Sequence, residues 1–136
     1  MKRRRVNLKC TLTEYNGLYE KQKKKAETNL EHTVIQLFGV DRNLLDSEER
    51  CREKGRKVTE SLGLIVWKEF VHKFSLGISI IFVISESHLS IHTWPEYNYV
   101  HFDVITCLKS ANLQKMVELI EYEFQPEFIS VIKLIY

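Results

Sequence analysis

The chain has 136 residues, 44% of them hydrophobic and 28% charged, and a formal net charge of +2. This length suits one domain with a modest core, and a charge so near zero gives no global signal for nucleic-acid binding. No apolar run approaches the roughly 20 residues of a membrane-spanning helix, and the basic start is not followed by the apolar run of a secretory signal. The cysteines Cys10, Cys51 and Cys107 form no CxxC pair, which argues against a disulfide framework and a zinc site. We therefore expect a cytoplasmic protein.

Positive charge gathers in the first part of the chain, at residues 2–5 and 21–25. Runs of like charge are usually solvated tails, so residues 1–28 are predicted to form a flexible, non-catalytic N-terminal extension. Binding of nucleic acid or another anionic partner by this segment is the alternative interpretation.

Beyond the basic segment, strand and helix patterns follow one another. A β-branched and aromatic run that ends at Gly39 predicts a strand over 33–38. Asp46, with a glutamate three residues on, predicts the N-cap of a helix that ends at Gly63, although Gly55 weakens its continuity. Later patterns predict strands over 64–74, 78–85, 89–94 and 100–106, a helix over 111–124 and a last strand over 128–136.

The predicted order is β-α-β-β-β-β-α-β, with short turns between neighbouring strands. Such an order indicates an α+β fold, a two-layer sandwich in which a mainly antiparallel sheet carries helices on one face. We expect this domain to occupy residues 29–136.

One segment differs from ordinary strand sequence. The apolar run 80–84 leads into the sequence SESHLSIHTWPEY at residues 85–97. Strand alternation places His88, Ser90 and His92 on one face and the aliphatic residues between them on the other. Taken alone, this alternation is typical of a solvated sheet face. The two histidines do not indicate a metal site, because the sequence fixes no third ligand nearby.

The same segment carries a family resemblance. Residues 86–97, ESHLSIHTWPEY, resemble the processing-site signature of the prokaryotic S-adenosylmethionine decarboxylase proenzymes, and DVITC at 103–107 follows at the spacing of that family. Residues 72–79 resemble the hairpin before the signature, and 32–39 resemble the first strand. The resemblance covers about residues 30–136 and implies a pyruvoyl-dependent carboxy-lyase.

In that family the chain makes its own cofactor, a pyruvoyl group. The resemblance implies cleavage between Glu86 and Ser87, which gives a β chain, 1–86, and an α chain, 87–136, with the pyruvoyl group derived from Ser87. A carbonyl of this kind forms a Schiff base with the substrate amine and accepts the electron pair that decarboxylation leaves.

The resemblance also implies roles for four further residues. His92 is expected to accept a proton during processing, with Ser79 assisting, and Cys107 to return a proton after carbon dioxide leaves. Phe74 is expected to stack on the adenine of the substrate. Three of them also have a structural reading: Ser79 as a turn hydroxyl, Cys107 and Phe74 as core packing.

The hairpin and four single positions depart from the family pattern. The hairpin is one residue shorter and lacks a proline, and Ile80 stands at a position that is typically glycine. Gln36 replaces a common glutamate, and glycines are replaced by Asn98 and Leu108. The loss of a charge and the altered hairpin affect the expected substrate rather than the self-processing.

The expected function is conversion of S-adenosylmethionine to decarboxylated S-adenosylmethionine for spermidine biosynthesis. We expect a homodimer of cleaved αβ protomers acting on a small molecule, with no nucleic-acid or membrane partner. Arginine or ornithine decarboxylation on the same scaffold is the first alternative. A non-catalytic regulatory or scaffold paralogue is the second, and the joint presence of Ser87, His92 and Cys107 argues against it.

Overall fold

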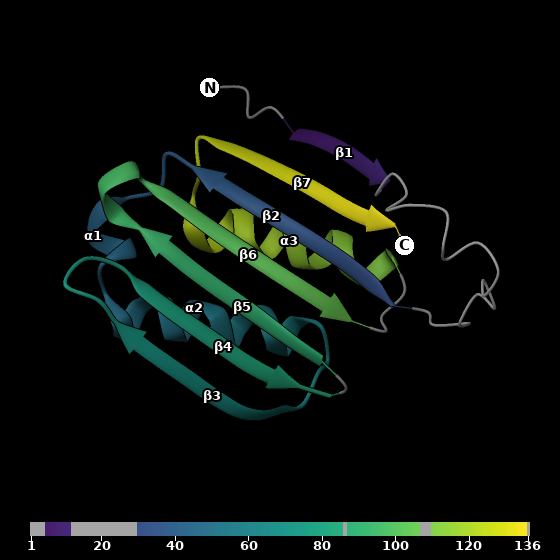
Figure 1. Ribbon diagram of the computed structural model, residues 1–136, viewed down its shortest axis with the longest axis horizontal. Coiled ribbons are helices and arrows are strands. Elements are labelled where there is room, and N and C mark those ends of the chain that lie inside the picture. The colour runs from purple at the N-terminus through teal and green to yellow at the C-terminus, as the bar shows by residue number, and fades with distance from the viewer. Residues whose placement is uncertain (1–4, 12–29, 86, 107–109, 136) are drawn as a thin grey trace, which may run out of the picture.

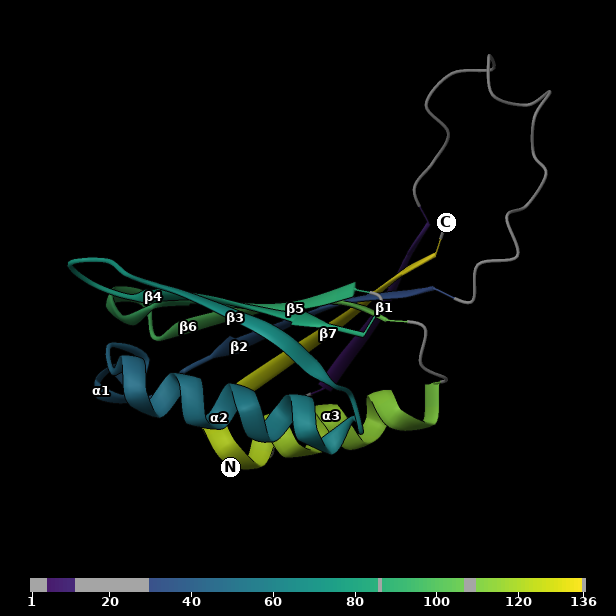
Figure 2. The same ribbon diagram turned by 90° about the horizontal axis from the view of Figure 1, so that it is seen from below.

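A sheet and a layer of helices on one of its faces make up the molecule (Figures 1 and 2). The computed structural model describes residues 5–11, 30–85, 87–106 and 110–135. Its elements are β1 (Arg5–Thr11), β2 (Glu31–Phe38), α1 (Arg42–Leu45), α2 (Glu48–Ser61), β3 (Val66–Lys73), β4 (Ile78–Ile84), β5 (Ser87–Trp94), the 3₁₀ turn η2 (Pro95–Tyr97), β6 (Tyr99–Thr106), α3 (Ser110–Phe124) and β7 (Phe128–Ile135).

Within these residues the sheet has seven strands in the order β1-β7-β2-β6-β5-β4-β3. Every neighbouring pair is antiparallel except β1 and β7, which are parallel. The predicted α+β sandwich, a mainly antiparallel sheet with helices on one face, is confirmed.

The core lies between the sheet and the helices, because alternate strand residues point toward α2 and α3. In β4 the residues Ile78, Ile80, Phe82 and Ile84 are buried while those between them are more exposed. Phe124 of α3 is also buried. This alternation is the pattern of a strand with one face on a core.

Gly55 stands where α2 packs directly against the sheet. A Cβ atom at this position would lie 2.8 Å from the ring of Phe82 and 2.9 Å from Cδ1 of Ile91. The helix is continuous over Glu48–Ser61, so the glycine serves close packing rather than a break in the helix.

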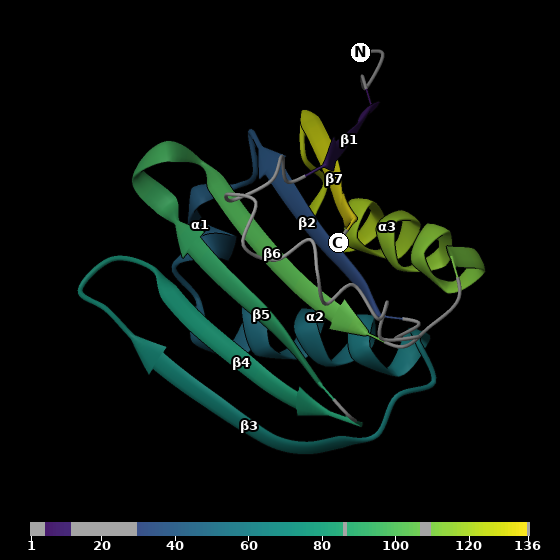
Figure 3. The ribbon, with the colours of Figure 1, turned by 45° about the vertical axis from the view of Figure 1, so that its right-hand side comes forward.

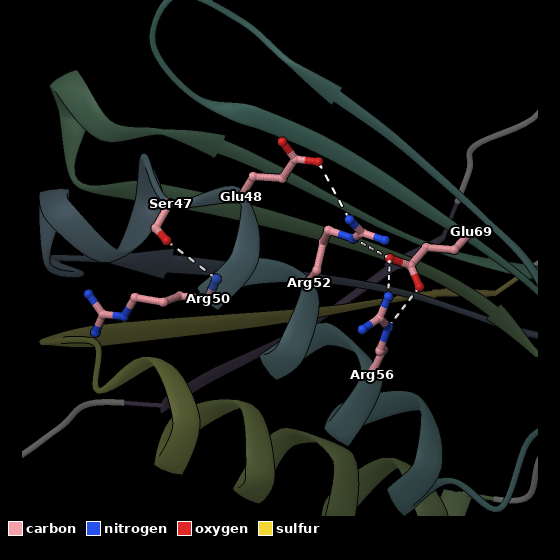
Figure 4. A network of polar contacts seen from close by, with 6 residues as sticks. All are labelled: Ser47, Glu48, Arg50, Arg52, Arg56 and Glu69. Carbon is pink, nitrogen blue, oxygen red and sulfur yellow. Dashed lines mark hydrogen bonds and ion pairs between the residues drawn. The ribbon is translucent and has the colours of Figure 1, made fainter.

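The predicted helix start at Asp46 is wrong by one residue. Ser47 is the N-cap of α2, and its hydroxyl accepts a hydrogen bond from the backbone N–H of Arg50 at 3.3 Å (Figure 4). The Asp46 carboxylate instead accepts from the backbone N–H of Gly77 at 3.0 Å and from Lys73 Nζ at 2.7 Å. These bonds lower the pKa of Asp46 and join the helix start to the β3–β4 turn.

Ion pairs attach α2 to the edge strand β3 (Figure 4). Arg52 Nε and Arg56 Nε donate to the two carboxylate oxygens of Glu69, at 2.6 Å and 2.9 Å. Burial of Glu69 works against its charged form, but the hydrogen bonds from Arg56 and Arg52 leave its pKa below the usual range.

The strand β1 was not predicted. It pairs in parallel with the outer edge of β7, from Arg5 opposite Ile129 to Thr11 opposite Ile135. An unpaired sheet edge readily accepts another strand, and Val6, Leu8 and Cys10 alternate with polar residues as a strand requires. The prediction of a flexible extension over 1–28 therefore does not hold for Arg5–Thr11; residues 1–4 and 12–28 lie outside the described part of the chain.

The sheet face opposite the helices, which we call the open face, is covered by none of the described helices (Figures 2 and 3). It carries large apolar side chains that remain exposed: Phe38, Phe70, Ile81 and Trp94, at 38–56%. An apolar face of this kind is typical of an interaction surface. Among the helices that the structure describes, none is long and apolar enough to cross a bilayer.

Candidate active site

Ser79 and His92 meet on the open face. They are directly opposite one another in the β4–β5 pair, and Ser79 Oγ lies 2.7 Å from His92 Nδ1. Strand pairing thus brings together two residues that the family resemblance predicts to act in self-processing.

The surroundings of His92 favour its neutral form. Burial lowers the pKa of His92, the neighbouring His101 lowers it further, and Asp103 acts in the opposite direction. A neutral imidazole can accept a proton, which a base in an elimination step must do.

A row of polar side chains continues from His92 across the open face. His101 of β6 lies directly opposite His92, and Gln36 of β2 lies directly opposite His101. Tyr99 joins the last two: its hydroxyl lies 3.0 Å from Gln36 Nε2 and 2.9 Å from His101 Nδ1. The sequence-based reasoning missed Tyr99 and His101, although they alternate with apolar residues in β6 as His88, Ser90 and His92 do in β5.

Ser87 is the first residue of β5 and lies opposite Ile84 of β4, next to the turn that joins the two strands. It is partly exposed and follows the turn residue Ser85; Glu86 lies outside the described residues. A hydroxyl-bearing residue at the turn end of the ladder fits a pyruvoyl precursor, because the new chain end would be accessible to a substrate.

Ser87 and His92 do not meet within one chain. They are five positions apart on a single strand, which separates their Cα atoms by about 17 Å at the usual rise per residue. Neither side chain can span that distance. One chain therefore places the predicted cleavage position and the Ser79–His92 pair at opposite ends of the β4–β5 hairpin.

The remaining predicted site residues are Cys107 and Phe74. Cys107 lies outside the described residues, but Thr106 before it ends β6, next to the pair His88–Ile105 at the Ser87 end. Phe74 lies at the Ser79–His92 end, half exposed, with its ring 4.5 Å from the ring of His72.

Two further observations limit the chemistry. Cys51 is buried, its Sγ donates to the Leu44 carbonyl at 3.2 Å, and burial raises its pKa to about 12, so this thiol is unreactive. Within the described residues, no three side chains of the metal-binding types gather to hold an ion.

The fold and the hairpin together define a two-layer α+β protein with a serine at a strand start and a serine–histidine pair on its open face. Comparison with known proteins identifies the family to which this class of protein belongs. A family model described as S-adenosylmethionine decarboxylase matches residues 31–135. The chain belongs to the S-adenosylmethionine decarboxylase family.

Several relatives carry the name S-adenosylmethionine decarboxylase proenzyme. The chain is 32% identical over 101 residues to the protein of Pyrococcus horikoshii, a match that covers 74% of this chain and 73% of that one. It is 34% identical over 105 residues to the protein of Thermotoga maritima, covering 68% and 81%. The crystal structure of the adenosylmethionine decarboxylase from Aquifex aeolicus is similar with a TM-score of 0.70 and 28% identity, over 78% of this chain and 88% of that chain.

Proposed function

We propose that the protein is a self-processing, pyruvoyl-dependent decarboxylase that converts S-adenosylmethionine to decarboxylated S-adenosylmethionine for spermidine synthesis. The observation that carries the proposal is the position of Ser87, a serine next to the β4–β5 turn, inside the segment that matches the family model. All proposed reacting residues lie in 29–136, which we assign as the decarboxylase domain.

Self-processing uses the chain's own groups. The Ser87 hydroxyl attacks the Glu86 carbonyl carbon, and the amide becomes an ester as the C–N bond breaks. A base then removes the Ser87 α-proton, and the Glu86 carboxylate leaves. The remaining dehydroalanine tautomerises and is hydrolysed with loss of ammonia, which leaves a pyruvoyl group at the start of the chain 87–136. When present, this carbonyl group supplies an electron sink for decarboxylation.

His92 is the proposed base of the elimination. With its proton on Nδ1 and donated to Ser79, the Nε2 atom has a free lone pair. The lowered pKa of His92 keeps this form populated at neutral pH. Ser79 orients the ring, and a hydroxyl near the developing oxyanion can also donate to it.

A second copy of the chain is needed to bring this base to Ser87, because about 17 Å separates the two positions in one chain. A twofold axis that lies between two facing sheets and crosses β5 at right angles, between Leu89 and Ser90, would place the Ser87 end of β5 in one copy over the His92 end of β5 in the other. The exposed apolar side chains of the open face would be buried by the same contact. We therefore propose a homodimer with two shared sites.

Cys107 and Phe74 complete the proposed site. Cys107 follows the β6 residue nearest the Ser87 end, where a protonated thiol can return a proton to the substrate carbon. Phe74 lies at the Ser79–His92 end of its own chain and would therefore meet the Ser87 end of the other copy. There its exposed ring can stack on adenine.

Intact-mass measurement tests self-processing. Wild-type protein is expected as two chains, 1–86 and 87–136, and the Ser87→Ala variant as one chain. A single uncut wild-type chain would instead favour the scaffold alternative.

Carbon dioxide release tests the substrate. S-adenosylmethionine, arginine and ornithine are supplied side by side to the processed enzyme, and the first is expected to give the fastest release. Release from arginine or ornithine alone would reverse the substrate assignment. Decarboxylation of arginine or ornithine is the leading alternative because the neutral Gln36 stands at a position commonly occupied by glutamate.

A further inference from the structure

The turn between β3 and β4 carries Phe74 and lies at the same end of the molecule as α1 (Figures 1 and 2). Within the turn, the backbone N–H of Phe74 donates to the carbonyl of Gly77 at 3.0 Å. Residues 74–77, FSLG, contain no proline that would restrict the backbone. The conformation of the turn therefore depends on its contacts with the rest of the molecule.

The carboxylate of Asp46 holds this turn at both of its ends. The Oδ1 atom of Asp46 accepts from the backbone N–H of Gly77 at 3.0 Å and from Lys73 Nζ at 2.7 Å. The same ammonium group of Lys73 donates to the carbonyl of Phe74 at 2.7 Å. Because hydrogen bonds with a charged partner are stronger than neutral ones, these three bonds favour a single backbone conformation around Phe74.

Asp46 is itself fixed by the sheet. The carbonyl of the preceding residue, Leu45, accepts from Thr93 Oγ1 at 2.7 Å, and the same Thr93 oxygen accepts from the backbone N–H of Ile78 at 2.9 Å. Gly77 has a φ of +93°, and a Cβ atom there would lie 2.5 Å from the Thr93 carbonyl oxygen. The buried Thr93 therefore anchors both the carboxylate-bearing segment and the end of the turn.

The ring of Phe74 remains available to a ligand beside the proposed site. It is 50% exposed, and its centroid lies 4.5 Å from that of His72, with an angle of 71° between the two ring planes. His72 lies directly opposite Ser79, the partner of His92. An aromatic ring that is supported on one side and exposed elsewhere is suited to stacking on a planar base.

We propose that Asp46 and Lys73 are positioning residues for Phe74: their hydrogen bonds hold the β3–β4 turn in the conformation in which the Phe74 ring stacks on the adenine of the substrate. This inference rests on the proposed role of Phe74 in binding S-adenosylmethionine. It assigns to both residues an effect on substrate affinity and not on the decarboxylation step.

The expected effect follows from the fraction of molecules in which the turn has this conformation. A ligand that binds one conformation has an apparent dissociation constant that rises as the population of that conformation falls. Loss of the Asp46 carboxylate or of the Lys73 ammonium removes bonds that select the conformation. Both side chains are partly exposed, at 39% and 33%, so neither substitution leaves an unpaired charge in the core.

Steady-state kinetics of the processed enzyme test the proposal. Asp46→Ala and Lys73→Met are expected to raise the KM for S-adenosylmethionine by about 3–10-fold while kcat stays within about twofold of wild type. The inhibition constant of methylthioadenosine should rise by the same factor. This probe carries the adenosine part of the substrate but no amino group that could form a Schiff base, so its constant reports binding alone.

Glu69→Gln is the matched control. It also removes a carboxylate that joins β3 to the helical layer, but at a position away from the turn, and should leave both constants unchanged. Lys73→Met gives a second measurement if Asp46→Ala fails to fold. Unchanged constants in the variants of Asp46 and Lys73 overturn the proposal.

A double-mutant cycle separates positioning of Phe74 from any other effect. Phe74→Leu should raise both constants, and adding Asp46→Ala to it should raise them no further, because no ring is left to position. A further rise as large as that caused by Asp46→Ala alone would contradict the proposal. Failure of the proposed function would appear elsewhere, as a wild-type enzyme that releases no carbon dioxide from S-adenosylmethionine.

Discussion

At the scale of single residues, the environment of His92 decides when self-processing can occur. Burial and the neighbouring His101 disfavour its charged form, so the pKa of His92 lies below its ordinary value of 6.5. The base form is therefore present above that lowered pKa and is lost as the pH falls through it.

The rate of self-cleavage should follow this titration. Precursor made by cell-free translation and transferred to buffers of different pH should be cut at a constant rate near neutrality and more slowly only below pH 6.5. His92→Asn should slow cleavage by about 10²–10⁴-fold at neutral pH, because the general base is lost, and this difference should shrink in acid, where the wild-type base is protonated. Fragment formation on denaturing gels measures both, and a wild-type rate in the variant would remove His92 from the mechanism.

Cys107 should affect turnover and not processing. The Cys107→Ala chain is expected to be cut normally and to release carbon dioxide at least about 10²-fold more slowly, because only the proton donor is missing. Cys51→Ala is a control for loss of a thiol, since the Cys51 thiol is buried with a pKa of about 12. Wild-type turnover in Cys107→Ala would show that another group donates the proton.

At the scale of elements, the approach of α2 to the sheet depends on Gly55. Gly55→Ala should lower the free energy of unfolding by about 1–2 kcal/mol, because overpacking against Phe82 and Ile91 outweighs the gain of about 1 kcal/mol in helix propensity. Glu60→Ala, an exposed change in the same helix, should stay within about 0.5 kcal/mol of wild type. Urea denaturation measures both free energies of unfolding. A Gly55→Ala variant more stable than wild type would mean that Phe82 and Ile91 move aside at little cost.

The attachment of α2 to β3 should depend on pH. Glu69→Gln is expected to cost about 1 kcal/mol at pH 7, a value kept small by the partial exposure of both arginines. Because the pKa of Glu69 is lowered in the folded chain, this stability is present above the ordinary value of 4.5 and is lost as the pH falls below it. The difference between variant and wild type should therefore shrink in acid, while the exposed Glu53→Gln should show little difference at any pH.

At the scale of the whole molecule, the separation of Ser87 from His92 turns the dimer into a testable requirement. Ser87→Ala and His92→Asn chains with different tags are co-expressed, so that a mixed dimer contains one site with both wild-type residues. In that dimer the His92→Asn chain should be cut and the Ser87→Ala chain should not. Mixed dimers that form but remain uncut would show that the site is not shared.

Much of the architecture could be predicted from local pattern. The strands on either side of the processing segment follow from apolar alternation. Asn98, which stands where the family commonly has glycine, has a left-handed backbone with φ of 51°, a conformation that asparagine tolerates. Asp46 was misassigned because its partners, Lys73 and Gly77, are distant in sequence. Ser87 and His92 are only five positions apart in the sequence, which suggests that they lie close together. In the structure they are far apart, because the strand between them is extended. Tyr99 and His101 become part of the site only through cross-strand pairing, which no single segment reveals.

The order of the strands has a consequence for how the enzyme can be assembled. In the sheet, β2 lies between β6 and β7, and β4 lies beside β5. Scission before Ser87 would therefore leave two interleaved polypeptides, held by every ladder they shared before the cut, and gel filtration should show no change. Once unfolded, however, the two pieces would have to find each other again in a bimolecular reaction. The precursor folds as a single molecule, so the mature protein depends on a folding event that precedes its own maturation.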